Sequence, residues 1–353
     1  MTRIENIQNK LKAQNLDAAV LFSDVNIRYA AQCYITDGAA VVTQNGAWLL
    51  TDSRYIEAAR AQAVGAEARL FDAEHPLGKQ LKDLLSGCAK IGAEEHSLAY
   101  ADWNRWQETL GRDFVPAEQL ILDLRSVKDA DEAESITAAQ RIAETALDEV
   151  LEILKPGMTE RELAAELTYR MLLHGGEGNS FDPIAITGAH TSMPHGVPGD
   201  AVIRAGDFVT MDFGCLVNGY CSDMTRTVAV GSATDEMRRV YNTVLEAQLA
   251  GIAKARAGVT GAEIHAAAAK VIADAGYGAY FGHGFGHSVG LEIHEAPNAS
   301  PRNKNPMPAG AVVTAEPGIY IPGKFGVRIE DMLLLTEDGN VNLTKAPKEL
   351  MIL

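Results

Sequence analysis

The chain has 353 residues, of which 47% are hydrophobic and 22% charged, the composition of an ordinary globular protein. Because a single hydrophobic core rarely grows beyond about 250–300 residues, this length favours two domains. The formal net charge of −16 argues against nucleic acids and anionic membranes as main partners, since both are polyanions. Acidity that merely keeps a cytosolic protein dissolved is the simpler explanation of this charge.

The N-terminal segment and the cysteines favour a cytoplasmic location. Residues 1–20 form a polar, amphipathic stretch without the apolar run of a signal peptide. No segment approaches the roughly 18 uninterrupted apolar residues that a membrane span needs. The cysteines are few and form no Cys-x-x-Cys pair, which suits reduced thiols in a cytosol: Cys33, Cys88, Cys215 and Cys221.

Helical and extended patterns alternate in the first part of the chain. An apolar face predicts a helix around residues 4–11, and a continuous apolar run predicts a buried strand at 17–23. Asn45-Gly46 lies between two apolar runs and predicts a β-hairpin within residues 39–51. We therefore expect an α/β domain with a mixed sheet.

A charged stretch marks the boundary between the two domains. Residues 124–135 are dense in charge and open a helical pattern that continues to Leu154. Lys155-Pro156-Gly157 then ends the helix, because proline and glycine both disfavour its continuation. We place the boundary at about residues 123–128, which gives one domain of residues 1–125 and a second of residues 126–353.

A weak internal repeat divides the second domain. Residues 155–164 resemble residues 256–265, and each segment has a threonine three residues before a glutamate, the spacing of a capping box. Two coincidentally capped helices would explain this pattern alone. However, Asp212 follows the first threonine by 53 residues and Glu316 follows the second by 56. Two related half-domains, each supplying a hairpin with carboxylates, would face each other across a shared site.

The first of these hairpins carries two aspartates. Its strands flank Asn218-Gly219, a favoured two-residue turn, and counting back from the turn sets Asp212 opposite Thr225. Asp212 and Asp223 then lie on one face as diagonal neighbours. Two acids in an apolar hairpin would repel each other and lose hydration unless a cation lay between them. A solvent-exposed face is the alternative, although the neighbouring residues are not obviously polar.

A glycine-rich segment between the hairpins contains three histidines within twelve residues: His283, His287 and His294. Glycine allows the backbone to approach a ligand or a metal closely. A single histidine is usually structural, but three of them among glycines are not easily explained in that way.

The second hairpin turns at Pro322-Gly323 and places Glu316 and Glu330 in apolar, strand-like surroundings. Glu330 and Asp331 could instead form an exposed pair, but the apolar residues beside them favour a buried face. Four carboxylates and one histidine nitrogen are too acidic for a structural zinc site and suit manganese, cobalt or iron. Two ions about 3.5–4 Å apart, bridged by carboxylates, form the arrangement of aminopeptidases.

Five motifs of the second domain resemble the Xaa-Pro peptidase family, which comprises prolidases, aminopeptidase P and relatives with the pita-bread fold: MDFG, SDMTRT, GHGFGHSVGLEIHE, AEPGIY and VRIED. The resemblance covers about residues 126–353. The first 125 residues resemble the creatinase-type N-terminal domain, a match that rests on pattern and on DSRYIEAA. The resemblance therefore implies an α/β (α+β) fold with a creatinase-like mixed sheet followed by a pita-bread domain with a pseudo-twofold internal repeat.

The resemblance also implies a site with two divalent metal ions. Asp223 and Glu330 match the ligands that bridge both ions. Asp212 matches a ligand that chelates one ion, and His287 with Glu316 would complete the other. Manganese is the expected metal, and cobalt, iron and zinc are alternatives.

Further roles follow from the same resemblance. His195, in the segment SMPHGVP, matches a histidine near the scissile carbonyl, and His294 matches one that contacts the reacting group. Glu316 would accept and pass on a proton. His283 and Arg328 would bind the substrate.

The implied activity is hydrolysis of the N-terminal Xaa-Pro bond, by an Xaa-Pro aminopeptidase or dipeptidase that acts as a homodimer. A peptide with proline in the second position is the expected partner. A non-catalytic peptide-binding module is one alternative, since fold does not fix function, but such a module should have lost ligands. Another metal-dependent hydrolase or lyase is a second alternative, and the complete ligand set argues only against a metal-free creatinase type.

Overall fold

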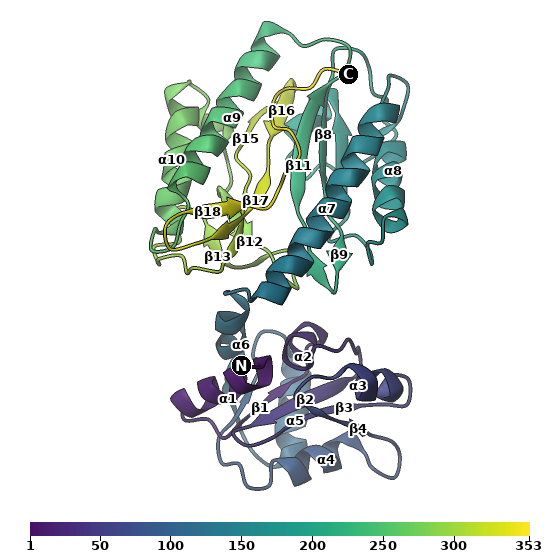
Figure 1. Cartoon of the computed structure of the whole chain (residues 1–353), viewed down its shortest axis with the longest axis vertical. Helices are drawn as coiled ribbons and strands as arrows, with labels where there is room; N and C mark the ends of the chain where they lie inside the picture. Colours follow the sequence, from purple (N-terminus) through teal and green to yellow (C-terminus); the bar gives the residue numbers. More distant parts are fainter. The chain divides into compact units, whose positions relative to one another are not determined.

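The computed structural model describes all 353 residues, which divide into two compact units, residues 1–125 and 126–353 (Figure 1). No helix has both the length and the apolar character that a membrane span requires.

A six-stranded sheet forms the centre of the first unit, in the order β4-β3-β2-β1-β5-β6. The hairpin β2–β3 and the pair β1–β2 are antiparallel, whereas β3–β4, β1–β5 and β5–β6 are parallel, so the predicted mixed sheet is confirmed. The elements of this unit are α1 (Arg3–Ala13), β1 (Ala18–Leu21), α2 (Asp24–Ala31), β2 (Gly38–Thr43), β3 (Ala47–Thr51), α3 (Ile56–Gln62), β4 (Glu67–Leu70), α4 (Leu77–Leu84), β5 (Ile91–Ala93), α5 (Tyr100–Leu110), β6 (Phe114–Pro116) and α6 (Glu118–Arg125).

The second unit contains two helix pairs, each followed in the chain by strands that form a hairpin. Its first half consists of α7 (Ala130–Ile153), α8 (Glu160–Leu173), β7 (Ile184–Thr187), the 3-10 helix η1 (Gly188–Ser192), β8 (Phe208–Phe213), β9 (Leu216–Val217), β10 (Tyr220–Cys221) and β11 (Met224–Ala229). Its second half consists of α9 (Asp235–Lys254), α10 (Gly261–Asp274), the 3-10 helix η2 (Gly278–Tyr280), β12 (Gly286–Ser288), β13 (Glu295–Ala299), β14 (Val312–Ala315), β15 (Gly318–Ile321), β16 (Phe325–Arg328), β17 (Asp331–Leu335) and β18 (Asn340–Asn342).

Each helix pair of the second unit buries its apolar face against the strands of its own half. Leu147 and Leu163 of the first pair pack with Met211 of β8, whereas Val244 of the second pair packs with Leu333 of β17. Figure 1 shows α7 and α8 on one side of the strands and α9 and α10 on the other. The predicted internal repeat therefore appears as two helix pairs that enclose the strands from opposite sides.

The helix starts agree with the capping boxes predicted from the sequence. Thr159 and Glu162 cap α8 reciprocally, and Thr260 and Glu263 do the same for α10. In each case the threonine hydroxyl accepts a hydrogen bond from the glutamate N–H, and the glutamate side chain accepts one from the threonine N–H. These contacts satisfy amides that a helix start otherwise leaves without partners.

Candidate metal centre and active site

The turn at Asn218-Gly219 sets the register of the first hairpin. Both residues have positive φ angles, 50° and 75°, as a two-residue hairpin turn of the primed type requires. Asp212 consequently lies opposite Thr225, as the sequence predicted. The ladder is interrupted at Gly214, where an added Cβ would lie 1.9 Å from the carbonyl oxygen of Ser222, so only glycine permits this close approach.

The acids of both hairpins are withdrawn from solvent. The exposed fraction is 9% for Asp212, 3% for Asp223 and 1% for Glu330, and Asp331 is fully buried. The alternatives of an exposed first hairpin face and of an exposed Glu330-Asp331 pair are therefore wrong. Glu316 is half-buried.

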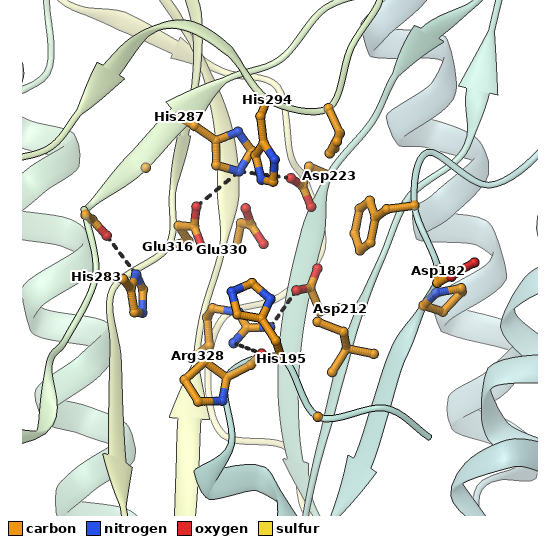
Figure 2. A pocket seen from close by; sticks show the side chains of 18 of the residues that line it. Asp182, His195, Asp212, Asp223, His283, His287, His294, Glu316, Arg328 and Glu330 are labelled. Atoms are coloured by element: carbon orange, nitrogen blue, oxygen red, sulfur yellow. Dashed lines mark hydrogen bonds and ion pairs between the residues drawn. The ribbon is translucent and has the colours of Figure 1, made fainter. Parts of the chain in front are cut away.

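All nine residues singled out in the sequence line one cavity of about 550 Å³ (Figure 2): His195, Asp212, Asp223, His283, His287, His294, Glu316, Arg328 and Glu330. They come from both halves of the second unit. Asp212 belongs to β8 and Asp223 directly precedes β11, whereas His287 belongs to β12 and Glu316 follows β14. Two distant hairpins and a glycine-rich segment thus bring their side chains to a common space.

The carboxylates at this cavity destabilise one another's charged forms. Burial raises the pKa of Asp223 well above its usual range, and the charges of Asp212 and Glu316 raise it further. The pKa of Glu330 is raised in the same way, by burial first and then by Asp223 and Glu316. Such a cluster is unfavourable for the isolated protein and becomes favourable when a cation lies among the carboxylates.

His287 presents a lone pair to two of these acids. Its Nδ1 lies 3.2 Å from the carbonyl oxygen of Ser288, an arrangement that places the proton on Nδ1 and leaves Nε2 free of hydrogen. Nε2 lies 3.5 Å from Oδ2 of Asp223 and 3.3 Å from Oε1 of Glu316. Burial lowers the pKa of His287 and keeps the ring neutral, as a metal ligand requires.

Asp212 provides the clearest test of whether a metal ion fits this site. Its Oδ2 lies 2.5 Å from Nη2 of Arg328, whereas its Oδ1 is buried without any hydrogen-bond partner. A buried carboxylate oxygen without a partner is costly unless it coordinates a cation. Asp223, His287 and Glu330 each offer one atom that could bind a metal ion, and these three atoms lie within 4.8 Å of one another. The donor set therefore fits a divalent ion with oxygen and imidazole ligands.

Arg328 connects several parts of the cavity wall. Its Nε donates to Oγ1 of Thr225, and Nη1 donates to the hydroxyl of Tyr320 and to the carbonyl of Pro194. The same Tyr320 hydroxyl lies 3.0 Å from Nε2 of His283. Tyr320 therefore links the arginine to the histidine.

Thr225 holds one of the acids by a hydrogen bond. Its hydroxyl donates to Oε2 of Glu330 at 2.6 Å and is fully buried. Neither Thr225 nor Tyr320 was predicted from the sequence to be functional. Both lie inside the matching motifs, SDMTRT and AEPGIY, which was the available signal.

Gln248 of α9 was also missed, and it holds the backbone beside two of the acids. Its Nε2 donates to the carbonyl oxygens of Ala315 and Ile329, which are the residues immediately before Glu316 and Glu330. The side chain of Gln248 is fully buried. No local pattern of the sequence connects a glutamine in a helix with two backbone carbonyls that follow 67 and 81 residues later.

The remaining two histidines face the cavity with exposed side chains. The ring of His294 lies edge-on to that of His287, with 4.4 Å between the ring centroids. His195 approaches from the loop after η1. The cavity wall also has apolar members, which include Phe181, Pro183, Ile184, Val197 and Ile293.

Comparisons with known proteins agree with this architecture. Residues 134–337 match Metallopeptidase family M24, and residues 3–127 match the Creatinase/Prolidase N-terminal domain. An Xaa-Pro dipeptidase from Pyrococcus furiosus is 35% identical over 350 residues, with 99% of each chain covered.

Two solved structures show the same fold along nearly the whole chain. A Xaa-Pro dipeptidase from Bacillus anthracis has a TM-score of 0.95 and 40% identity, with 99% of each chain covered. An X-Pro aminopeptidase from Thermotoga maritima has a TM-score of 0.93 and 35% identity, with 98% of this chain and 100% of that chain covered. The pita-bread fold expected from the sequence is confirmed. The chain belongs to Metallopeptidase family M24 and, within it, to the Xaa-Pro peptidases, and it is a metal-dependent exopeptidase.

Proposed function

We propose that this protein hydrolyses the bond between an N-terminal residue and proline, in dipeptides or longer peptides, with two divalent metal ions. The observation that supports this proposal most is the cluster of four carboxylates, with a histidine lone pair among them, on the wall of one cavity. The proposed preference for proline is supported by the relatives, because two matched structures are those of a Xaa-Pro dipeptidase and an X-Pro aminopeptidase.

Charge supports two ions rather than one. Four carboxylates face the single guanidinium of Arg328, which leaves three excess negative charges, more than one divalent ion can neutralise. We assign the metal ligands as Asp212, Asp223, His287, Glu316 and Glu330, and we propose manganese as the metal. When bound, divalent ions of this kind lower the pKa of water and polarise a carbonyl oxygen.

Glu316 is the proposed proton carrier. Its carboxylate would take up the proton of the attacking water and deliver it to the proline nitrogen as the peptide bond breaks. In the metal-free protein, burial raises the pKa of Glu316. Thr314 donates a hydrogen bond to Oε1 at 3.0 Å and fixes the orientation of this carboxylate.

The histidines and the apolar wall would orient the substrate. His195 and His294 would donate hydrogen bonds to the carbonyl oxygen of the residue before proline as that oxygen gains negative charge. His283 and Arg328 would also contact the substrate. The apolar wall, which includes Ile184 and Ile293, suits a hydrophobic side chain or the proline ring.

We further propose that residues 126–353 form the catalytic domain and that residues 1–125 form a separate creatinase-like domain. The matches to two different families, one for each part, support this division. A cytoplasmic location is consistent with four cysteines that are all unpaired. The homodimer stays a prediction of the resemblance.

A peptide assay with a demetallated and a manganese-loaded sample tests the proposal. We expect the loaded sample to cleave Ala-Pro, Met-Pro or Ala-Pro-Ala, and to cleave the matched peptides with alanine in place of proline far more slowly. Elemental analysis should approach two ions per chain. Equal rates on the alanine peptides would exclude the proline preference, and undiminished turnover after complete demetallation would exclude metal-dependent hydrolysis.

A further inference from the structure

We propose that the pair formed by the buried Glu160 and the half-buried His190 positions the catalytic loop, which we define as residues 188–199, and thereby aims His195 at the reacting carbonyl. The inference rests on the proposed function, because His195 acts there as a hydrogen-bond donor. Neither Glu160 nor His190 lines the cavity, so both would be positioning residues rather than catalytic ones.

Glu160 fastens the two ends of the catalytic loop. It is the first residue of α8, and its exposed fraction is 1%. Its Oε1 accepts a hydrogen bond from the N–H of Thr187, just before the loop, at 2.9 Å. Its Oε2 accepts one from the N–H of Gly199, at the end of the loop, at 3.0 Å. One carboxylate therefore closes the loop at its base.

His190 extends this support from the base to the residue beside His195. Its Nδ1 lies 2.8 Å from Oε1 of Glu160 and 3.0 Å from Oε2, so the ring is held by the carboxylate. The opposite edge of the ring touches Gly196, where an added Cβ would lie 2.9 Å from Nε2 and 3.1 Å from Cδ2 of His190. A continuous series of contacts therefore connects Glu160, through His190, with Gly196, the residue next to His195.

The side chain of His195 has no hydrogen bond of its own to fix it. Its ring is exposed at the cavity, and its direction therefore depends on the backbone of the catalytic loop. The loop is also tied to the second half of the unit, because the hydroxyl of Thr191 accepts a hydrogen bond from the N–H of Gly326. Arg328 donates to the carbonyl of Pro194, next to His195. A misplacement of about 1 Å can reduce turnover by about 10²-fold.

A double-mutant cycle distinguishes positioning from general stabilisation. In the manganese-loaded enzyme, His190→Ala should lower kcat by about 10-fold to 10²-fold on Ala-Pro, with a smaller change in KM. In the His195→Ala background, His190→Ala should change kcat by less than about 2-fold, because the group that it positions is absent. Equal losses in both backgrounds would show that His190 does not act through His195.

Two further variants keep the proposal testable if His190→Ala does not fold. Glu160→Gln weakens the anchor with little change in volume, and Gly196→Ala pushes a methyl group against the ring of His190 and against Cδ1 of Ile186. Both should show the same dependence on His195. His174→Ala is the matched control, because His174 also pairs with a glutamate, Glu149, at 2.8 Å, but on the far end of α8. This control should leave kcat unchanged.

Hydrogen exchange gives a result that does not depend on activity. Amides of residues 187–199 should exchange faster in His190→Ala and Glu160→Gln than in the wild type and the control, while β8 and α8 stay protected. Unchanged exchange in this segment would overturn the positioning role even if turnover fell. Absence of Xaa-Pro hydrolysis in the wild type would instead contradict the proposed function and leave the exchange result to decide on the loop.

Discussion

Arg226 and Asp331 form an ion pair of 2.9 Å in which both side chains are completely excluded from solvent. Arg226 also donates to the carbonyl oxygen of Glu330, a proposed metal ligand, and to those of Ala346 and Pro347 near the C-terminus. A guanidinium can satisfy several acceptors at once because its five N–H groups lie in a fixed plane. The pair therefore joins the first hairpin to the strand of the second hairpin and to the C-terminal segment.

Removing this arginine should destabilise the protein strongly. Arg226→Met leaves several buried carbonyl oxygens without donors and should lower the free energy of unfolding by about 3–5 kcal/mol. Urea unfolding of the metal-free protein measures the change. Lys270→Ala is the control, since Lys270 pairs with Asp274 on the surface and should contribute less than about 1 kcal/mol. A loss of equal size in both variants would contradict the structural role of the buried pair.

Neutralising one of the acids proposed to bind metal should affect metal binding more than folding. Asp223→Asn or Glu330→Gln removes one negative charge from the cluster, so metal content and turnover should both fall. The metal-free variants should be as stable as the wild type or more stable, because carboxylates without a cation repel one another. Elemental analysis and thermal unfolding check the two halves of this prediction. Wild-type metal content in Asp223→Asn would show that Asp223 is not a ligand.

The advantage of Glu330→Gln over the wild type should depend on pH. In the metal-free folded protein the pKa of Glu330 lies well above its ordinary value of 4.5, so the folded state holds a proton that the unfolded state has lost. The wild type therefore loses stability as pH rises above about 4.5 toward the raised pKa, whereas the variant lacks this carboxyl group and keeps only the shifts of the other acids, Asp223 and Glu316. The difference in unfolding free energy should grow between pH 5.5 and pH 8. A constant difference over this range would mean that Glu330 has an ordinary pKa.

Removing either cavity histidine should separate turnover from metal binding. His195→Ala and His294→Ala should keep both metal ions, because neither residue is a proposed ligand. Each should lose about 10²–10³ in kcat, the usual effect of removing one donor to a developing oxyanion. Kinetics, metal content and melting temperature together decide the question. If His195 merely packs its loop, its variant should melt earlier and keep turnover within a few-fold.

Local rules of the sequence predicted much of this molecule. Asn218-Gly219 determines the hairpin register because few residue pairs tolerate two positive φ angles in succession. The capping boxes of α8 and α10 involve residues three apart, so their contacts follow from helix geometry alone. Once the register is known, Asp212 and Asp223 must share a face. The exposed alternative for Glu330 and Asp331 remained open because strand polarity alone does not reveal burial.

The supporting contacts could not be predicted in the same way. Arg226 and Asp331 are 105 residues apart, and Gln248 reaches the carbonyls of Ala315 and Ile329, which follow much later in the chain. Such contacts depend on how the two halves meet, which no local pattern encodes. A buried arginine or glutamine in a sequence looks like any solvent-facing residue, since these side chains are usually exposed. The pairing of Glu160 with His190 was missed for the same reason.

The origin of the carboxylates in two half-domains has a consequence for how the protein unfolds. Asp212 and Asp223 belong to the first half, whereas Glu316 and Glu330 belong to the second. An ion held by donors from both halves acts as a removable cross-link, and its binding free energy is available only while both halves are folded together. Unfolding of either half would release the ion, so the folded state of each half would be stabilised by that of the other as long as metal is bound. Metal supply would thereby control not only catalysis but also the cooperativity with which the two halves melt.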